Sequence, residues 1–127
     1  MQKVIIKTDK VPLPIGPYNQ AVRIGDLIYT AGQISLDAKT NQLIDGGITE
    51  QTTLVIEHLK NVLKAAGSSL DKAVKATVFL KDMNDFAAMN AVYMQHFKNE
   101  TAPARSTIQA ARLPKDVLVE IELVAHI

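Results

Sequence analysis

The sequence predicts an α+β fold, in which a single mixed sheet of about six strands carries two helices on one face. Two observations predict it. Segments rich in β-branched and aromatic residues occur near both ends of the chain, and two segments between them carry apolar residues at helical spacing. The 127 residues, of which 47% are hydrophobic, suffice for one core, so we expect a single domain over residues 1–127.

The region before the first helix predicts loops and strands. Residues 11–18, "VPLPIGPY", predict an ordered, extended loop, because proline fixes its own φ and disfavours helix in the residue before it. Residues 21–32, "AVRIGDLIYTAG", predict a hairpin, since two β-rich runs flank a turn at Gly25 and Asp26. Residues 35–47 predict a long surface loop.

Two amphipathic helices are predicted, over residues 48–66 and 84–97. Thr49 or an earlier residue is suited to cap the start of the first helix, and Gly67 suits its end. The apolar stripes consist of Val55, Leu59, Val62 and Ala66 in the first helix, and of Phe86, Met89, Tyr93 and Phe97 in the second.

Three further strands are predicted, over residues 74–81, 105–111 and 117–125. The expected order is three strands, helix, strand, helix and two strands, with the last two strands paired as a hairpin across "RLPKD". The final strand is partly apolar on both faces, and two helices cover only one face of a sheet. This pattern favours a homo-oligomer in which other subunits cover the second face.

The composition excludes several classes of function. The 14 basic and 13 acidic residues leave a net charge of +1 with no basic run, which argues against a nucleic-acid or membrane surface. The absence of cysteine excludes disulfides and thiolate chemistry. The three histidines lack metal-ligand spacing, so we expect neither metal nor cofactor. The N-terminal residues "MQKVIIKTDK" lack a long apolar run, and we expect a cytoplasmic protein.

Arg105 and Glu122 are the first candidates for a functional site. Arg105 begins a strand of small residues, which leaves room for a carboxylate on its guanidinium. In the predicted hairpin Glu122 meets Arg105 at the open end, where a carboxylate can orient or deprotonate water. On spacing alone the alternatives are favoured: an ordinary Arg–Glu surface pair, or solvated glutamates at Glu120 and Glu122.

Three neutral residues are further candidates. Asn90 falls on the aromatic stripe of the second helix, and its amide either reaches a ligand or bonds a backbone carbonyl, the commoner outcome. Tyr18, on the proline-rich loop, either points its phenol into a cleft or packs. Gly32, at a strand end, either admits a ligand close to the backbone or marks an ordinary turn.

Four segments together resemble the reactive-intermediate deaminase family (Rid, or YjgF-like, proteins), closest to its RidA-type imine deaminases. They are "IGPYNQAV", "YTAGQI", "VFLKDMNDFAAMN" and "PARSTIQAARLPKDVLVEIE", and the resemblance covers essentially the whole chain. It implies a chorismate-mutase-like α+β fold and a homotrimer with a cleft at each subunit interface. It also implies that no cofactor or metal is needed.

The resemblance further implies an activity: hydrolysis of reactive enamines and imines such as 2-aminoacrylate, 2-iminopropanoate and 2-iminobutanoate to 2-oxo acids and ammonia. Pyridoxal-phosphate dehydratases release these compounds from serine and threonine. By the same resemblance Arg105 clamps the substrate carboxylate, Glu122 positions the attacking water, and Tyr18 and Asn90 line the cleft.

The backbone around Gly32 and Thr107 is implied to bind the substrate nitrogen or the water. Many members have cysteine at the position of Thr107, so no thiol takes part here, and Ala31 replaces the serine of some members. Two other functions remain open. One is a regulatory protein that binds 2-oxo acids, against which a retained carboxylate argues. The other is an RNA-directed ribonuclease or translation inhibitor, against which the balanced charge argues.

Overall fold

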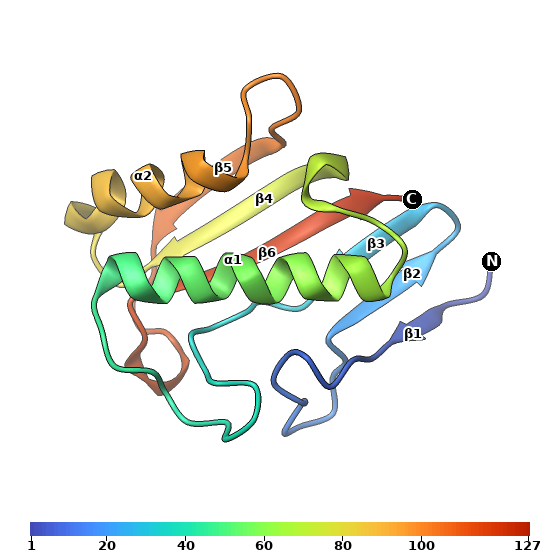
Figure 1. The fold of residues 1–127 in the computed structure, drawn as a ribbon, viewed down its shortest axis with the longest axis horizontal. Helices are drawn as coiled ribbons and strands as arrows, with labels where there is room; N and C mark the ends of the chain where they lie inside the picture. The colour runs from blue at the N-terminus through green and yellow to red at the C-terminus, as the bar shows by residue number, and fades with distance from the viewer.

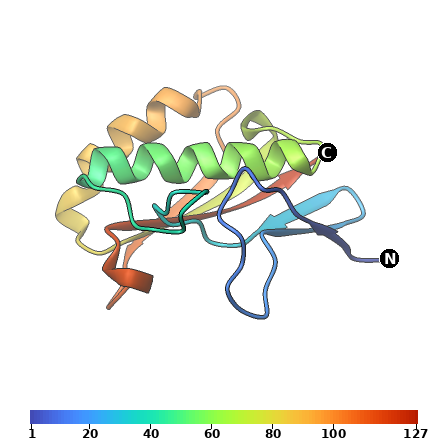
Figure 2. The same ribbon diagram turned by 60° about the horizontal axis from the view of Figure 1, so that its bottom comes forward.

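A six-stranded mixed sheet forms one layer of the molecule, and two helices form the other (Figure 1). The computed structural model describes all residues 1–127. The strands are β1 (Val4–Ile6), β2 (Ala21–Ile24), β3 (Leu27–Thr30), β4 (Ala73–Leu80), β5 (Ala104–Gln109) and β6 (Val119–His126), and the helices are α1 (Ile48–Ala65) and α2 (Phe86–His96). Both helices lie on the same side of the sheet, which confirms the predicted fold class (Figure 2).

The strand order is β1-β2-β3-β6-β4-β5, so the last strand of the chain lies inside the sheet. The predicted hairpin between the two C-terminal strands is therefore wrong. β6 is antiparallel to both β3 and β4, whereas β5 is parallel to β4 and forms an edge. The predicted hairpin at Gly25 is confirmed, with β2 and β3 antiparallel and Gly25 at a φ of 57°.

The physical reason for the C-terminal topology is the helix between β4 and β5. A connection that contains a helix returns the chain to the same end of the sheet, so the two strands it joins run parallel as neighbours. β6 then fills the place between β3 and β4. It is the strand best suited to that place, because Val119, Ile121, Leu123 and Ala125 are all at most 2% exposed.

Helix α1 covers the middle of the sheet. Its start is capped by Glu50, whose Oε1 accepts a hydrogen bond from the backbone N–H of Gly47 at 2.8 Å. Its end is followed by Gly67, which has a φ of 83°, a conformation that favours glycine. Leu59 and its helix neighbours join Ile121 of β6 in one core cluster of 22 buried residues.

The other face of the sheet is open. Tyr29 of β3 and Ile108 of β5 are 43% and 48% exposed, and Phe79 and Val124 are partly exposed beside them. Exposed apolar side chains on adjacent strands are typical of a surface that another subunit covers. Neither helix is both long and apolar enough to cross a membrane.

Candidate active site

A cavity of about 500 Å³ lies beside the start of β6 and the end of β3. It is lined by the proline-rich loop, by the segment that follows β3, and by the turn before β6. The side chains and backbone of Tyr18, Gly32, Lys115 and Glu120 contribute to its wall. Two residues that the sequence analysis selected, Tyr18 and Gly32, thus meet at one cavity.

Glu120 is the charged residue on the β6 side of this cavity. The backbone of Gln33 exchanges hydrogen bonds with Ile121 at 2.9 and 3.3 Å, so Gly32 lies beside β6 on the open face, next to the side chains of the residues that flank Ile121. A Cβ atom on Gly32 would overlap the carboxylate of Glu120. Glycine is therefore required at this position for the carboxylate to keep its place.

The surroundings of Glu120 favour its neutral form. Burial raises the pKa of its carboxyl, and the nearby negative charge of Glu122 raises it further. A raised pKa is the direction of shift that suits a carboxyl group to general acid–base catalysis.

The sequence analysis selected Glu122 instead, and no signal in the sequence alone separates the two glutamates. Both lie on the open face, because side chains alternate along a strand. Only their places in the fold distinguish them, since the Glu120 carboxylate lies over Gly32 and Glu120 lines the cavity. Glu122 is exposed and does not line the cavity.

The loop that carries Tyr18 is held by a residue that the sequence analysis missed. The side chain of Gln20 is buried and makes four hydrogen bonds to this loop. Its Oε1 accepts from the backbone N–H of Thr8, and its Nε2 donates to the carbonyls of Thr8, Val11 and Pro12 at 3.0 to 3.2 Å. These bonds replace regular secondary structure in a segment that proline keeps extended.

Arg105 lies away from this cavity, on the other face of the sheet. It pairs with Ala76 of β4, which pairs with the buried Leu123 of β6, and residues paired in this way share a face. Glu122 pairs with Thr77, one position further, and points to the open face. The predicted meeting of Arg105 and Glu122 is therefore wrong within one chain.

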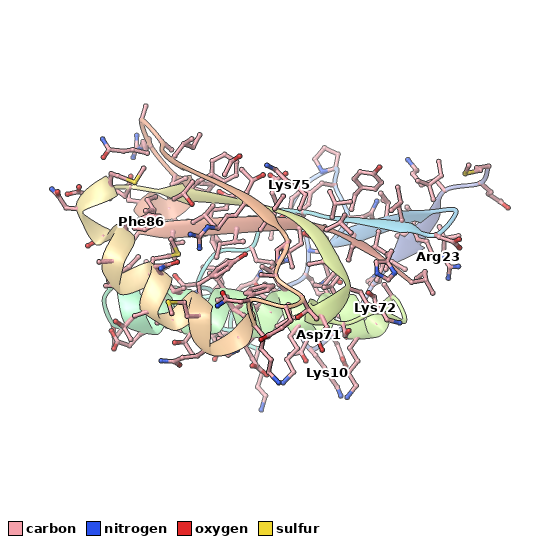
Figure 3. All side chains as sticks on the ribbon, turned by 90° about the horizontal axis from the view of Figure 1, so that it is seen from above. Lys10, Arg23, Asp71, Lys72, Lys75 and Phe86 are labelled. Atoms are coloured by element: carbon pink, nitrogen blue, oxygen red, sulfur yellow. The ribbon has the colours of Figure 1, made fainter.

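Arg105 packs against helix α2. One guanidinium nitrogen, Nη1, donates to Oδ1 of Asn90 at 2.8 Å. The Asn90 amide therefore bonds a side chain, and not the backbone carbonyl that was the commoner of its two expected partners. The guanidinium carbon lies 5.5 Å from the ring centre of Phe86 and 4.5 Å from that of Tyr93. Figure 3 shows Phe86 at the end of α2 that meets the sheet.

No carboxylate neutralises Arg105. The only salt bridge in the structure joins Arg112 and Asp116 on the surface, with nitrogen and oxygen 2.8 Å apart. The edge-strand ion pair considered for Arg105 is thus absent. Thr107, two residues further along β5, has a buried hydroxyl oxygen with no hydrogen-bond partner, as does Tyr93. A half-buried cation that no carboxylate neutralises is suited to bind a small anion.

The raised pKa of Glu120 predicts a pH dependence of stability. Between the ordinary pKa of the unfolded chain and the raised pKa of the folded protein, the folded state binds more protons. The free energy of unfolding therefore falls as pH rises through this window. In Glu120→Gln this loss is absent, so wild type should lose stability relative to the variant as the pH rises from about 4, the ordinary range of a glutamate pKa, to neutral pH.

Urea unfolding of both proteins at the two pH values tests this expectation. Glu100→Gln, in an exposed turn, controls for the substitution itself. A difference between wild type and Glu120→Gln that does not change with pH would contradict the assignment of a raised pKa.

Comparison with known proteins assigns the chain to a family. Residues 8–127 match the family described as Endoribonuclease L-PSP. A RutC family protein of Pyrococcus abyssi is 52% identical over 126 residues, which cover 99% of this chain and 98% of that protein. A protein of Mus musculus named 2-iminobutanoate/2-iminopropanoate deaminase is 44% identical over 121 residues, covering 95% and 89% of the two chains. The crystal structure of RidA from an Antarctic Psychrobacter species has a TM-score of 0.93 at 40% identity, with 98% and 99% covered. The chain therefore belongs to the reactive-intermediate deaminase (Rid, or YjgF-like) family, as its motifs predicted.

Proposed function

We propose that this protein hydrolyses 2-imino and 2-enamino carboxylates, such as 2-iminopropanoate, 2-iminobutanoate and 2-aminoacrylate, to 2-oxo acids and ammonia. The observation that carries the proposal is the unneutralised Arg105, held by Asn90 and two aromatic rings. Arginine binds a carboxylate through two parallel hydrogen bonds, and every such substrate has a carboxylate next to the reacting carbon. The deaminase name of the mouse relative supports the same reaction.

The proposed site needs two copies of the chain. Arg105 and Glu120 lie on opposite faces of one sheet, so a single chain does not bring both to one small substrate. In a symmetric homotrimer, the β5 edge of one copy lies beside the cavity of the next. The exposed apolar residues of the open face, among them Tyr29 and Ile108, support this arrangement because oligomerisation would bury them.

In the proposed reaction Glu120, and not Glu122, activates water. The carboxylate of Glu120 takes a proton from water as the water oxygen bonds to C2 of the protonated imine. The C=N electron pair moves to the nitrogen, which gives a neutral tetrahedral amino alcohol. The protonated Glu120 then gives its proton to the nitrogen, the C–N bond breaks as ammonia leaves, and the C2 hydroxyl proton passes to the Glu120 carboxylate as the oxygen becomes the carbonyl of the 2-oxo acid. The iminium carbon is already electrophilic, so positioning and proton transfer suffice.

The remaining candidates take binding roles in this scheme. Arg105 clamps the carboxylate, and Asn90 fixes the guanidinium. Tyr18 closes the cavity from the proline-rich loop, and the backbone near Gly32 holds the water or the substrate nitrogen beside Glu120. The backbone of Thr107 on the neighbouring β5 contributes a further hydrogen bond. This assignment requires no metal or cofactor.

Imine hydrolysis fits the site better than cleavage of RNA. RNA hydrolysis usually employs a histidine base or a metal ion together with a basic groove. None of the three histidines lines the cavity, and His58 is buried with its Nε2 2.6 Å from the carbonyl oxygen of Leu36. A protein with the proposed activity would act on imines that pyridoxal-phosphate dehydratases release from serine and threonine, and we infer that it does so in the cytoplasm.

Substitution of the proposed carboxylate clamp tests the reaction directly. Threonine dehydratase generates 2-iminobutanoate in the presence of semicarbazide, which traps the imine, and formation of 2-oxobutanoate is followed. Wild type should speed this formation, and Arg105→Ala should lose about tenfold to hundredfold in kcat/KM because a charge-assisted hydrogen-bonded pair is removed. Arg112→Ala, which removes an exposed arginine, is the matched control and should remain active.

If wild type does not compete with the trap but still binds 2-oxobutanoate, the enzyme proposal fails and a binding protein takes its place. If RNA is cleaved by wild type and not by Arg105→Ala, the RNA-directed alternative is supported instead.

The choice between the two glutamates is tested in the same assay. Glu120→Gln should lower kcat by at least about a hundredfold, since general acid–base catalysis contributes on this scale. Glu122→Gln is the matched comparison on the same strand and face, and its activity should stay near that of wild type. The opposite result would restore Glu122, the residue that the motifs implied, as the group that activates water.

A further inference from the structure

One face of helix α2 surrounds the Arg105 guanidinium with neutral groups. Phe86, Asn90, Tyr93 and Phe97 follow one another at spacings of four, three and four residues, which places them on one side of a helix. Three of the four contact Arg105 or lie over its guanidinium. We propose that Phe86 and Tyr93 are positioning residues that hold the plane of the Arg105 guanidinium for the substrate carboxylate.

This inference rests on the proposed function, because it assigns the rings a role in presenting Arg105. Its first support is the distances. The guanidinium carbon is 4.5 Å from the centre of the Tyr93 ring and 5.5 Å from that of Phe86, within the range of cation–π contact. Stacking on a ring restricts the rotation of the planar guanidinium before the ligand binds. Less conformational entropy is then lost on binding.

The second support is that the Tyr93 ring is itself fixed. Its other neighbour is Phe97, whose ring centre lies 4.3 Å away with 21° between the ring planes. Tyr93 is 5% exposed and Phe97 is 6% exposed, so both belong to the core. Arg105 therefore lies on a surface anchored in the core, and not on a mobile side chain.

The third support is electrostatic. A protein usually orients an arginine with a carboxylate, but a carboxylate would neutralise the charge and compete with the substrate for the same N–H groups. Aromatic rings hold a guanidinium without using its donors. Asn90 accepts one hydrogen bond, which leaves the other N–H groups of the five available.

The fourth support concerns the Tyr93 hydroxyl. It is buried and has no hydrogen-bond partner, so it makes no hydrogen bond to Arg105 or Asn90. Burial also raises its pKa, so the hydroxyl stays neutral beside Arg105. The ring, and not the hydroxyl, is thus the part that serves the site, and Tyr93→Phe should preserve the function.

The test measures Arg105 and the ligand separately. The mobility of the arginine Nε–H groups is read by ¹⁵N relaxation in the free protein, where only Arg23, Arg105 and Arg112 contribute signals. Binding of 2-oxobutanoate, a stable product, is measured by calorimetry. The variants are Tyr93→Leu, Phe86→Leu and Tyr93→Phe, with Val92→Ala as the control for lost core packing, since Val92 is 3% exposed on the same helix.

The proposal predicts that Tyr93→Leu and Phe86→Leu make the Arg105 signal mobile. It also predicts that they weaken binding by roughly threefold to thirtyfold, the range of one cation–π contact. Tyr93→Phe and Val92→Ala should keep both a rigid Arg105 and wild-type affinity. An Arg105 signal that stays rigid in both leucine variants would overturn the proposal, and so would a mobile Arg105 with unchanged affinity.

A separate variant distinguishes this proposal from the proposed function. If Arg105→Ala binds 2-oxobutanoate as tightly as wild type, the carboxylate clamp itself is wrong. If Arg105→Ala loses binding and the leucine variants do not, only the role of the rings is refuted.

Discussion

The alternation of side chains along β6 is the constraint on which the rest of the structure depends. Val119, Ile121, Leu123 and Ala125 point into the core below α1, and the residues between them point to the open face. A shift of one residue in pairing would turn every core side chain toward solvent, so the register is strongly fixed. The same register puts Glu120 on the open face, where its carboxylate lies over Gly32. The position of Glu120 is therefore a consequence of core packing.

The fold contains two half-buried ionisable side chains, Glu120 and Arg105, and the surroundings of the two differ. Glu120 is desolvated next to a second glutamate, which raises its pKa. Arg105 is oriented by an amide and two rings, and no carboxylate neutralises it. Both arrangements cost free energy in the isolated chain. In the proposed oligomer, an anionic substrate bound between the β5 edge and a second subunit would provide an interaction partner for each of the two charged groups.

Much of the fold could be predicted from the sequence because local patterns determine it. Apolar periodicity located both helices to within a few residues, and Gly25 marked the first hairpin. The pairing of β6 with β3 and β4 could not be read from adjacent strands, since it depends on contacts between residues far apart in the chain. The helix between β4 and β5 did carry the signal for a parallel crossover. Arg105 and Asn90 were selected by residue type, and the structure brings their side chains into contact. The places of Glu120 and Gln20 were not predicted, because they depend on strand register and on loop conformation.

The central claim is that the active site forms between two copies of the chain. The proposed mechanism predicts that Arg105→Ala and Glu120→Gln each lose activity at every site of their own homo-oligomers. In mixed oligomers, some interfaces combine the intact Arg105 of one variant with the intact Glu120 of the other. Unfolding the two variants together, refolding them and assaying 2-iminobutanoate hydrolysis tests the claim most directly. The account predicts that activity returns in the mixture and not in either variant refolded alone. A mixture that stays as inactive as its components, although the subunits have exchanged, would contradict it.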